Sequence, residues 1–72
     1  MESYMIEYRT NRFVVVCYYN AENKTCEVTV YNKEGEEWLI VGNYIEDRKD
    51  WHFDTEFSQF RSMLGLIRHN IM

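Results

Sequence analysis

Acidic and histidine side chains alternate in the last third of the chain, where they could ligate a divalent metal ion. Asp50, His52 and Asp54 follow one another at every second position, and Glu56 is close by. Carboxylate and imidazole groups together can bind zinc or calcium. However, the run has no glycine for the sharp turn of a calcium loop, and the chain has neither HExxH nor paired CxxC motifs. We interpret the run as a charged loop that leads into a helix cap, and we expect no metal and no cofactor.

Cys17 and Ser58 are the candidates for a catalytic nucleophile. Cys17 lies inside an apolar run with no positively charged neighbour to lower its pKa, so a reactive thiolate is not expected. The three glycines are isolated from one another, which excludes a glycine-rich phosphate loop. The sequence therefore predicts a non-enzymatic protein, with an enzyme as the weakest alternative.

Two clusters of carboxylates suggest a different kind of chemistry, which is the imitation of a nucleic-acid backbone. Spaced carboxylates can occupy a basic channel of a partner protein. Lysines and arginines are interspersed among the acids, so ordinary solvated surface charge is the alternative interpretation. The acids that we assign to partner binding are Glu34, Glu36 and Glu37 in one cluster and Glu46, Asp47 and Asp50 in the other.

Length and composition limit the class of protein. The chain has 72 residues, 46% of them hydrophobic and 17% aromatic, with a formal net charge of −4. Such a chain forms one small domain, residues 1–72, that buries only about 60% of its unfolded surface. The longest apolar run, from Phe13 to Tyr19, is far shorter than the roughly 20 residues of a spanning helix. With two cysteines and no recognisable secretory leader, we expect a cytoplasmic protein with reduced thiols.

Two turn sequences predict β-hairpins. Asn32-Lys33-Glu34-Gly35 is typical of a type I turn with Gly35 at positive φ, which places Asn32 opposite Glu36. The segment from Asn20 to Asn23 repeats the pattern, with Asn23 in the place of glycine. The segments around these turns are rich in β-branched and aromatic residues. The sequence therefore predicts a four-stranded antiparallel meander within residues 1–45, with strands at 3–9, 13–20, 25–32 and 36–41.

The pairing register then decides which side chains share a face of the sheet. If Asn20 lies opposite Lys24, Cys17 points away from Cys26 and the two sulfurs cannot bond. A slip of one residue in this loop would instead place them opposite each other. The predicted core face has no charged member and consists of Val14, Val16, Tyr18, Cys26, Val28, Val30, Trp38 and Ile40.

A helix is predicted over residues 54–71. Its apolar residues are spaced three and four apart, which gives one stripe that packs on the core face. Asp54 or Thr55 would cap its start, and Arg68 with His69 would favour its end. Gly65 would allow a close approach of the helix to a strand. The stripe consists of Phe57, Phe60, Leu64, Ile67 and Ile71, broadened by Met63.

The connection before the helix, residues 46–53, is predicted to be a charged and aromatic loop. Tyr44 and Ile45 would extend the fourth strand past a bulge at Gly42. Trp51 and Phe53 alternate with a histidine, so one or both rings should tuck under the start of the helix. The complete prediction is a β-β-β-β-α fold of the α+β class.

The opposite sheet face is predicted to carry surplus apolar side chains. One helix covers only one side of a sheet, and monomers rarely leave large apolar patches uncovered. We infer that this face contacts another protein chain. Alternatively, the first strand curls so that the loop 42–53 covers these side chains. The predicted surplus face presents Tyr4, Ile6, Tyr8, Phe13, Val15, Cys17, Tyr19, Tyr31, Leu39 and Val41.

The sequence thus favours a protein-binding module that occupies a surface of a larger partner, such as an anti-CRISPR-like inhibitor from a phage or mobile element that covers a nuclease. A structural or regulatory homodimer is the alternative. A third candidate is a single-strand binder that stacks bases on its rings, but the chain lacks a basic groove, so direct nucleic-acid binding is not expected. The rings assigned to partner binding are Tyr4, Tyr8, Phe13, Tyr19 and Tyr31.

Overall fold

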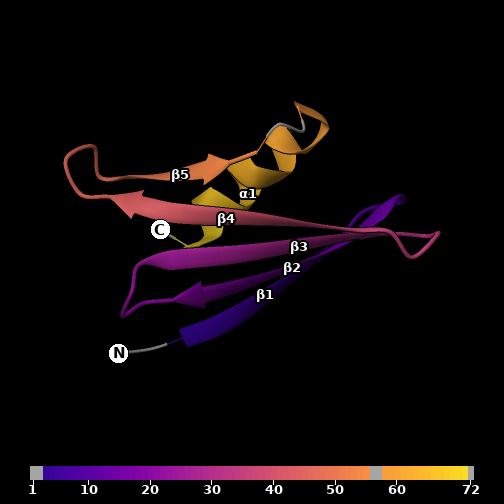
Figure 1. Ribbon diagram of the computed structural model, residues 1–72, viewed down its shortest axis with the longest axis horizontal. Helices are drawn as coiled ribbons and strands as arrows, with labels where there is room; N and C mark the ends of the chain where they lie inside the picture. The colour runs from indigo at the N-terminus through magenta and orange to yellow at the C-terminus, as the bar shows by residue number, and fades with distance from the viewer. Residues whose placement is uncertain (1–2, 56–57, 72) are drawn as a thin grey trace.

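The computed structural model describes residues 3–55 and 58–71, with the side chain of Tyr4 left out. It shows an α+β fold in which an antiparallel sheet is followed by one C-terminal helix on one side of it (Figure 1). The predicted class is confirmed, but the sheet has five strands instead of four, in the order β1-β2-β3-β4-β5. The elements are β1 Ser3–Arg9, β2 Phe13–Asn20, β3 Thr25–Asn32, β4 Glu37–Ile45, β5 Asp50–Asp54, the 3-10 turn η1 Ser58–Phe60 and α1 Arg61–Ile71.

The turn between β3 and β4 forms as predicted. Gly35 adopts a φ of 85°, which is the left-handed region that glycine enters without a steric penalty. The Asn32 side-chain oxygen accepts hydrogen bonds from the backbone N–H groups of Glu34 at 3.1 Å and Glu36 at 2.9 Å. This turn fixes the register of the two strands, and the predicted pairing of Val30 with Trp38 is confirmed.

The turn between β2 and β3 is one residue longer than predicted. Asn20 pairs with Thr25, and Lys24 takes the left-handed conformation at a φ of 53° in place of Asn23. The Asn23 N–H donates to the Asn20 side-chain oxygen at 3.0 Å. The longer loop carries Lys24 next to the turn between β4 and β5, where its ammonium group pairs with Glu46. These contacts of Lys24 favour the longer loop over the predicted one.

The extra loop residue reverses the two faces of β2. Val15 and Cys17, predicted to point outward, are fully buried, whereas Tyr18 is exposed. The predicted core positions of Val14 and Val16 are therefore wrong. For β3 and β4 the predicted core face is confirmed, with Cys26, Val28, Val30, Ile40 and Trp38 on the side of the helix.

The core lies between this inner face and α1. Its buried side chains pack without a charged member, and aromatic rings close both ends. Phe60 meets Phe13 and Trp38 with ring centroids 5.4 Å away in each case. At the other end Trp51 contacts the Tyr19 ring at 5.5 Å. The buried core members are Val15, Cys17, Cys26, Val28, Val30, Ile40, Trp51, Phe60, Met63, Leu64, Ile67 and Ile71.

The predicted loop 46–53 instead contains a turn and the fifth strand. The backbone N–H of Arg48 donates to the carbonyl of Ile45 at 3.2 Å, and Lys49 adopts a φ of 53°. The chain then returns as β5, antiparallel to β4. Pairing runs without interruption through Gly42, which lies opposite Phe53, so the bulge predicted there is wrong. Trp51 is buried as predicted, but it packs with Tyr19 and Tyr44 at the end of the core away from Phe60, so its predicted place under the start of the helix is wrong.

The helical stripe is confirmed, although the helix begins later than predicted. Asp54 ends β5 and does not cap α1, and the predicted stripe residue Phe57 lies outside the described residues. A Cβ placed on Gly65 would meet no atom within 4 Å, so the predicted close approach to a strand is wrong. Within the described chain, no helix has the length and apolar character needed to cross a bilayer.

Candidate protein-binding surface

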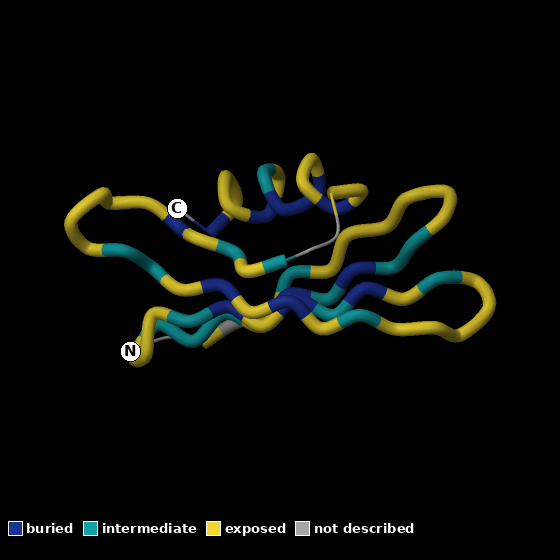
Figure 2. The backbone as a smooth tube through the Cα atoms, turned by 45° about the horizontal axis from the view of Figure 1, so that its top comes forward, coloured by how far each residue is buried: buried dark blue, intermediate teal, exposed yellow. Residues whose placement is uncertain are grey.

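The sheet has one face that the helix does not cover. Figure 2 shows α1 along one side of the sheet, and no other described element lies against the opposite side. Residues alternate between the two faces along every strand, so the register defines the uncovered side. We call it the outer face. By register, residues near the strand ends also lie on this side, namely Ser3, Asn20, Thr25, Asn43, Ile45 and Asp50. Its other members are Met5, Glu7, Arg9, Val14, Val16, Tyr18, Glu27, Thr29, Tyr31, Glu37, Leu39, Val41, His52 and Asp54.

The outer face presents large apolar side chains to solvent. Met5 is 69% exposed and Leu39 64% exposed, whereas Val28 and Val30 on the inner face are fully buried. Tyr18, Tyr31 and Val41 are also exposed, and the smaller Val14 and Val16 between them are half-buried. Apolar side chains occur on all four strands from β1 to β4, because Met5 pairs with Tyr18, Val14 pairs with Tyr31, and Tyr31 is a diagonal neighbour of Leu39. The surplus apolar surface therefore exists, but of the residues predicted for it Tyr31, Leu39 and Val41 lie on the outer face, whereas the inner face holds Ile6, Phe13, Val15, Cys17 and Tyr19.

The charge on the outer face is mainly negative. Besides Asp50, which lies near Arg68 of α1, four carboxylates lie on it, on β1, β3, β4 and β5, against one guanidinium group in the described strands. That cation, Arg9, is already paired with Glu7, at 2.7 Å from its Nη2 to the carboxylate Oε1. The remaining carboxylates are Glu27, Glu37 and Asp54. A partner that covers this face would therefore need apolar groups together with positive charge.

The aromatic residues that the sequence assigned to partner binding are divided between the two faces. Phe13 and Tyr19 are half-buried on the inner face and pack against the core. Tyr8 also lies on the inner face, at the open edge of the sheet beside Met63 and Leu66 of α1. Tyr31 is the described member on the outer face. The side chain of Tyr4 lies outside the described part of the structure. These rings therefore do not form the single platform that base stacking would need.

The two predicted acidic clusters lie at opposite ends of β4. Glu34, Glu36 and Glu37 surround the turn between β3 and β4, and Glu46, Asp47 and Asp50 surround the turn between β4 and β5 (Figure 1). Nine strand residues lie between the turns, which corresponds to roughly 30 Å. In the second cluster, Glu46 pairs with Lys24, and an Asp50 oxygen lies 3.7 Å from Arg68 Nε. The structure thus does not bring the acids together into one surface.

The two cysteines are neighbours in the core. Cys17 pairs with Val28 and Cys26 with Tyr19, so both sulfurs lie on the inner face, and the prediction that they point apart is wrong. A hydrogen bond from the Cys26 thiol lowers the pKa of Cys17. The same bond raises the pKa of Cys26, and burial raises it further. Neither sulfur is accessible to solvent.

We expect both thiols to resist alkylation in the folded protein, because an alkylating reagent reaches them only when the core opens. Iodoacetamide should label Cys17 and Cys26 together, and only at urea concentrations that unfold the chain. Mass spectrometry after timed quenching measures this. Rapid labelling of Cys17 alone in native buffer would contradict the burial described above.

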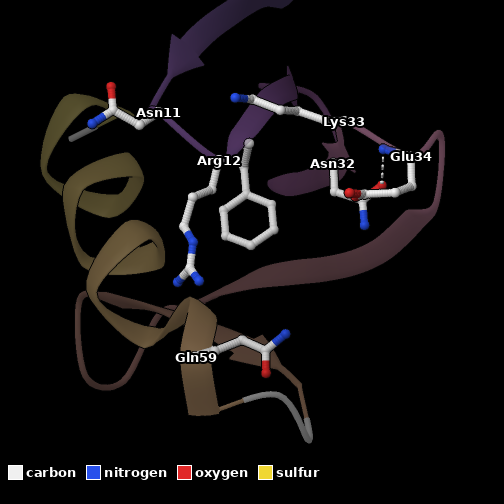
Figure 3. Close-up of a pocket in the computed structure, with 7 residues that line it drawn as sticks. Asn11, Arg12, Asn32, Lys33, Glu34 and Gln59 are labelled. Atoms are coloured by element: carbon white, nitrogen blue, oxygen red, sulfur yellow. Dashed lines mark hydrogen bonds between the residues drawn. The ribbon is translucent and has the colours of Figure 1, made fainter.

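A polar hollow lies at the end of the sheet that carries the turn between β3 and β4. It has a volume of about 600 Å³ and is lined by side chains from the turn between β1 and β2, from the turn between β3 and β4, and from η1. In Figure 3 the Arg12 guanidinium extends toward the Gln59 amide, and Asn32 is held by its hydrogen bond with the Glu34 backbone. Arg12 and Lys33 give it positive charge, so it can contact an anionic group. Among the described residues, no three His, Cys, Asp or Glu side chains are placed to hold a metal ion.

Comparisons with known proteins do not assign the chain to a family. No protein-family model, no curated protein and no solved structure matches it. The function is therefore inferred from the surfaces described above.

Proposed function

We propose that this chain is a non-enzymatic protein-binding module that uses its outer face to occupy a surface of a larger partner. The observation that carries the proposal is the exposed apolar surface of this face, on which Leu39 and Met5 are largely accessible to solvent. The molecule extends 37 Å by 24 Å by 17 Å. A sheet face of this extent is comparable to the roughly 800 Å² that each partner buries in a standard interface.

The charge of the outer face supports one form of this proposal. Carboxylates on four strands surround and interrupt the apolar centre, so the face complements a surface that is apolar and basic. Basic surfaces of this kind occur where proteins bind nucleic acid. An anti-CRISPR-like inhibitor from a phage or mobile element, which covers such a surface on a nuclease, fits this chemistry. A cytoplasmic setting fits the two free thiols, which stay reduced there.

Leu39→Asp is expected to abolish partner capture and to leave the fold intact. It places a charge at the centre of the outer face, and truncation of a central interface residue costs about 2 kcal/mol or more, which corresponds to roughly thirtyfold in affinity. The measurement is capture from a bacterial lysate by the tagged chain at low and moderate salt, followed by mass spectrometry. Circular dichroism checks the fold of each variant.

Leu66→Asp is the matched control, because Leu66 is exposed on α1 and not on the sheet. A partner retained by the wild type and by Leu66→Asp, but lost with Leu39→Asp, supports the proposal. If Leu66→Asp loses the partner and Leu39→Asp keeps it, binding uses the helix and not the outer face. If the wild type retains nothing at either salt concentration, the proposed function is wrong.

A further inference from the structure

A carboxylate lies in the middle of the apolar outer face. Glu27 is on β3, the central strand, and its cross-strand neighbours are Tyr18 on β2 and Val41 on β4. Glu27 is exposed, and no ion pair between described residues includes it. Lys24, in the turn before β3, pairs with Glu46, and Arg9, on β1, pairs with Glu7. Anything that covers this face must therefore accommodate the Glu27 charge.

We propose that Glu27 makes the outer face reject a second copy of this chain and accept a partner protein that presents an arginine or lysine among apolar side chains. This inference rests on the proposed function and specifies the chemistry of the partner. Burial of a carboxylate without a counter-charge is strongly unfavourable. The same carboxylate becomes an anchor when the partner supplies a cation with good hydrogen-bond geometry.

A symmetric dimer through the outer face is disfavoured, because the two-fold geometry would bring like charges together. In a two-fold dimer the same patch faces itself. With Glu27 near the centre of the patch, two carboxylates would meet inside an apolar interface. Glu37 and Asp54 add negative charge toward the edges of the same face. Natural sheets use such charges to prevent association between copies.

An arginine of a different protein satisfies the same geometry. Its planar guanidinium group can donate two parallel hydrogen bonds to the Glu27 carboxylate, and it can stack on the exposed ring of Tyr18 beside it. Apolar side chains around that arginine would cover Leu39 and Val41. A nucleic-acid backbone or an anionic lipid surface does not fit, because its phosphates would meet the carboxylates of the outer face.

The inference can be tested with the chain itself as the probe. Glu27→Arg presents the same apolar face with a cation at its centre, so it has the properties proposed for the partner. Sedimentation velocity at micromolar concentration and low salt should show the wild type and Glu27→Arg as monomers when each is alone. An equimolar mixture should form a one-to-one complex, with an apparent affinity at least about tenfold above that of either protein for itself. Glu27→Lys serves as a second variant if circular dichroism shows that Glu27→Arg is misfolded.

Glu22→Arg is the matched control, because it makes the same charge change in the turn between β2 and β3, away from the outer face. Its mixture with the wild type should remain monomeric. The inference is overturned if the wild type alone forms a dimer that Leu39→Asp dissociates. It is also overturned if the mixture with the folded Glu27 variant stays monomeric, or if the Glu22→Arg mixture associates equally. These outcomes are independent of lysate capture, so failure of the inference and failure of the proposed function can be distinguished.

Discussion

Replacing Phe60 with alanine should remove a large part of the free energy of unfolding. The Phe60 side chain is fully buried, and its ring contacts Phe13 and Trp38. A Phe→Ala change in a core costs about 3–5 kcal/mol, whereas a chain of this length is stabilised by only about 4–11 kcal/mol. Because Phe60 lies where η1 meets α1, its loss also weakens the attachment of the helix to the sheet. Phe60→Ala should therefore unfold at a much lower urea concentration than the wild type.

Urea titration followed by far-ultraviolet circular dichroism measures this effect, and tryptophan fluorescence, which comes from Trp38 and Trp51, reports on unfolding of the core. Leu66→Ala is the control on the same helix, because Leu66 is 46% exposed. Its midpoint should change little. If Phe60→Ala unfolds at the wild-type urea concentration, the ring cluster does not hold the helix on the sheet, and the assignment of the inner face as the core is wrong.

The position of this core has a consequence for function. All core residues lie on one side of the sheet, so the outer face contributes little to stability. The residues of the outer face can therefore be determined by the requirements of binding. Substitutions at Leu39 or Glu27 should therefore alter association without altering the urea midpoint. The two sides of one sheet have separable roles, and this is what makes the tests of binding interpretable.

The sequence was sufficient for the hairpin that ends in Gly35 and for the helical stripe. Glycine at positive φ is a specific local signal, and the register from Asn32 onward followed from it. The stripe from Phe60 to Ile71 is equally local, because its spacing reflects only the helical period. In both places, neighbours in the sequence determine the structure.

The sequence of β2 alone does not show which of its two faces is buried. Every residue from Phe13 to Tyr19 is apolar or aromatic, so the strand has no polar side that identifies its outer face. The face depended on the length of one loop, and that loop ends with Lys24 in a left-handed conformation that sequence rules assign to Asn or Gly. Its contact with Glu46, which is distant in sequence, favours the longer loop.

A signal for the correct face was present in the neighbouring strands. On β1 the charged side carries Glu7 and Arg9, and on β3 the polar side carries Glu27 and Thr29. These two sides should both face solvent, so they should lie on the same face of the sheet. The residues of β2 that pair with Glu7 and Thr29 then lie on the outer face, as Val16 does. Most of the outer face could therefore have been predicted from the requirement that the charged sides of paired strands lie on the same face of the sheet.

The fifth strand was missed for the same reason as the long loop. The turn before it also ends with a lysine at positive φ, Lys49, and contains neither glycine nor asparagine. The charged residues 46–49 therefore suggested a loop without structure. The alternation of Trp51, His52 and Phe53 was the strand signal, and it became β5 because Trp51 fits into the ring cluster with Tyr19 and Tyr44.

Gly42→Ala is expected to destabilise the sheet, even though alanine is a small residue. A Cβ at position 42 would lie 2.4 Å from Cε1 and 2.6 Å from Cδ1 of the Phe53 ring, which covers the glycine from the paired strand. The ring cannot move freely, because it stacks against Trp51 at 6.3 Å. Overpacking of this kind costs about 1–3 kcal/mol. A lower urea midpoint for Gly42→Ala is the expected measurement.

Two further variants show whether the Phe53 ring is the cause. Gly65→Ala is the matched control, since its Cβ meets no atom within 4 Å, and alanine in a helix is favoured over glycine by about 1 kcal/mol. It should raise the midpoint. Phe53→Leu removes the ring atoms that clash, so Gly42→Ala should cost less in the Phe53→Leu background than in the wild type, which gives a coupling free energy of about 1 kcal/mol. Equal costs in the two backgrounds would show that the Phe53 ring is not the cause of the destabilisation.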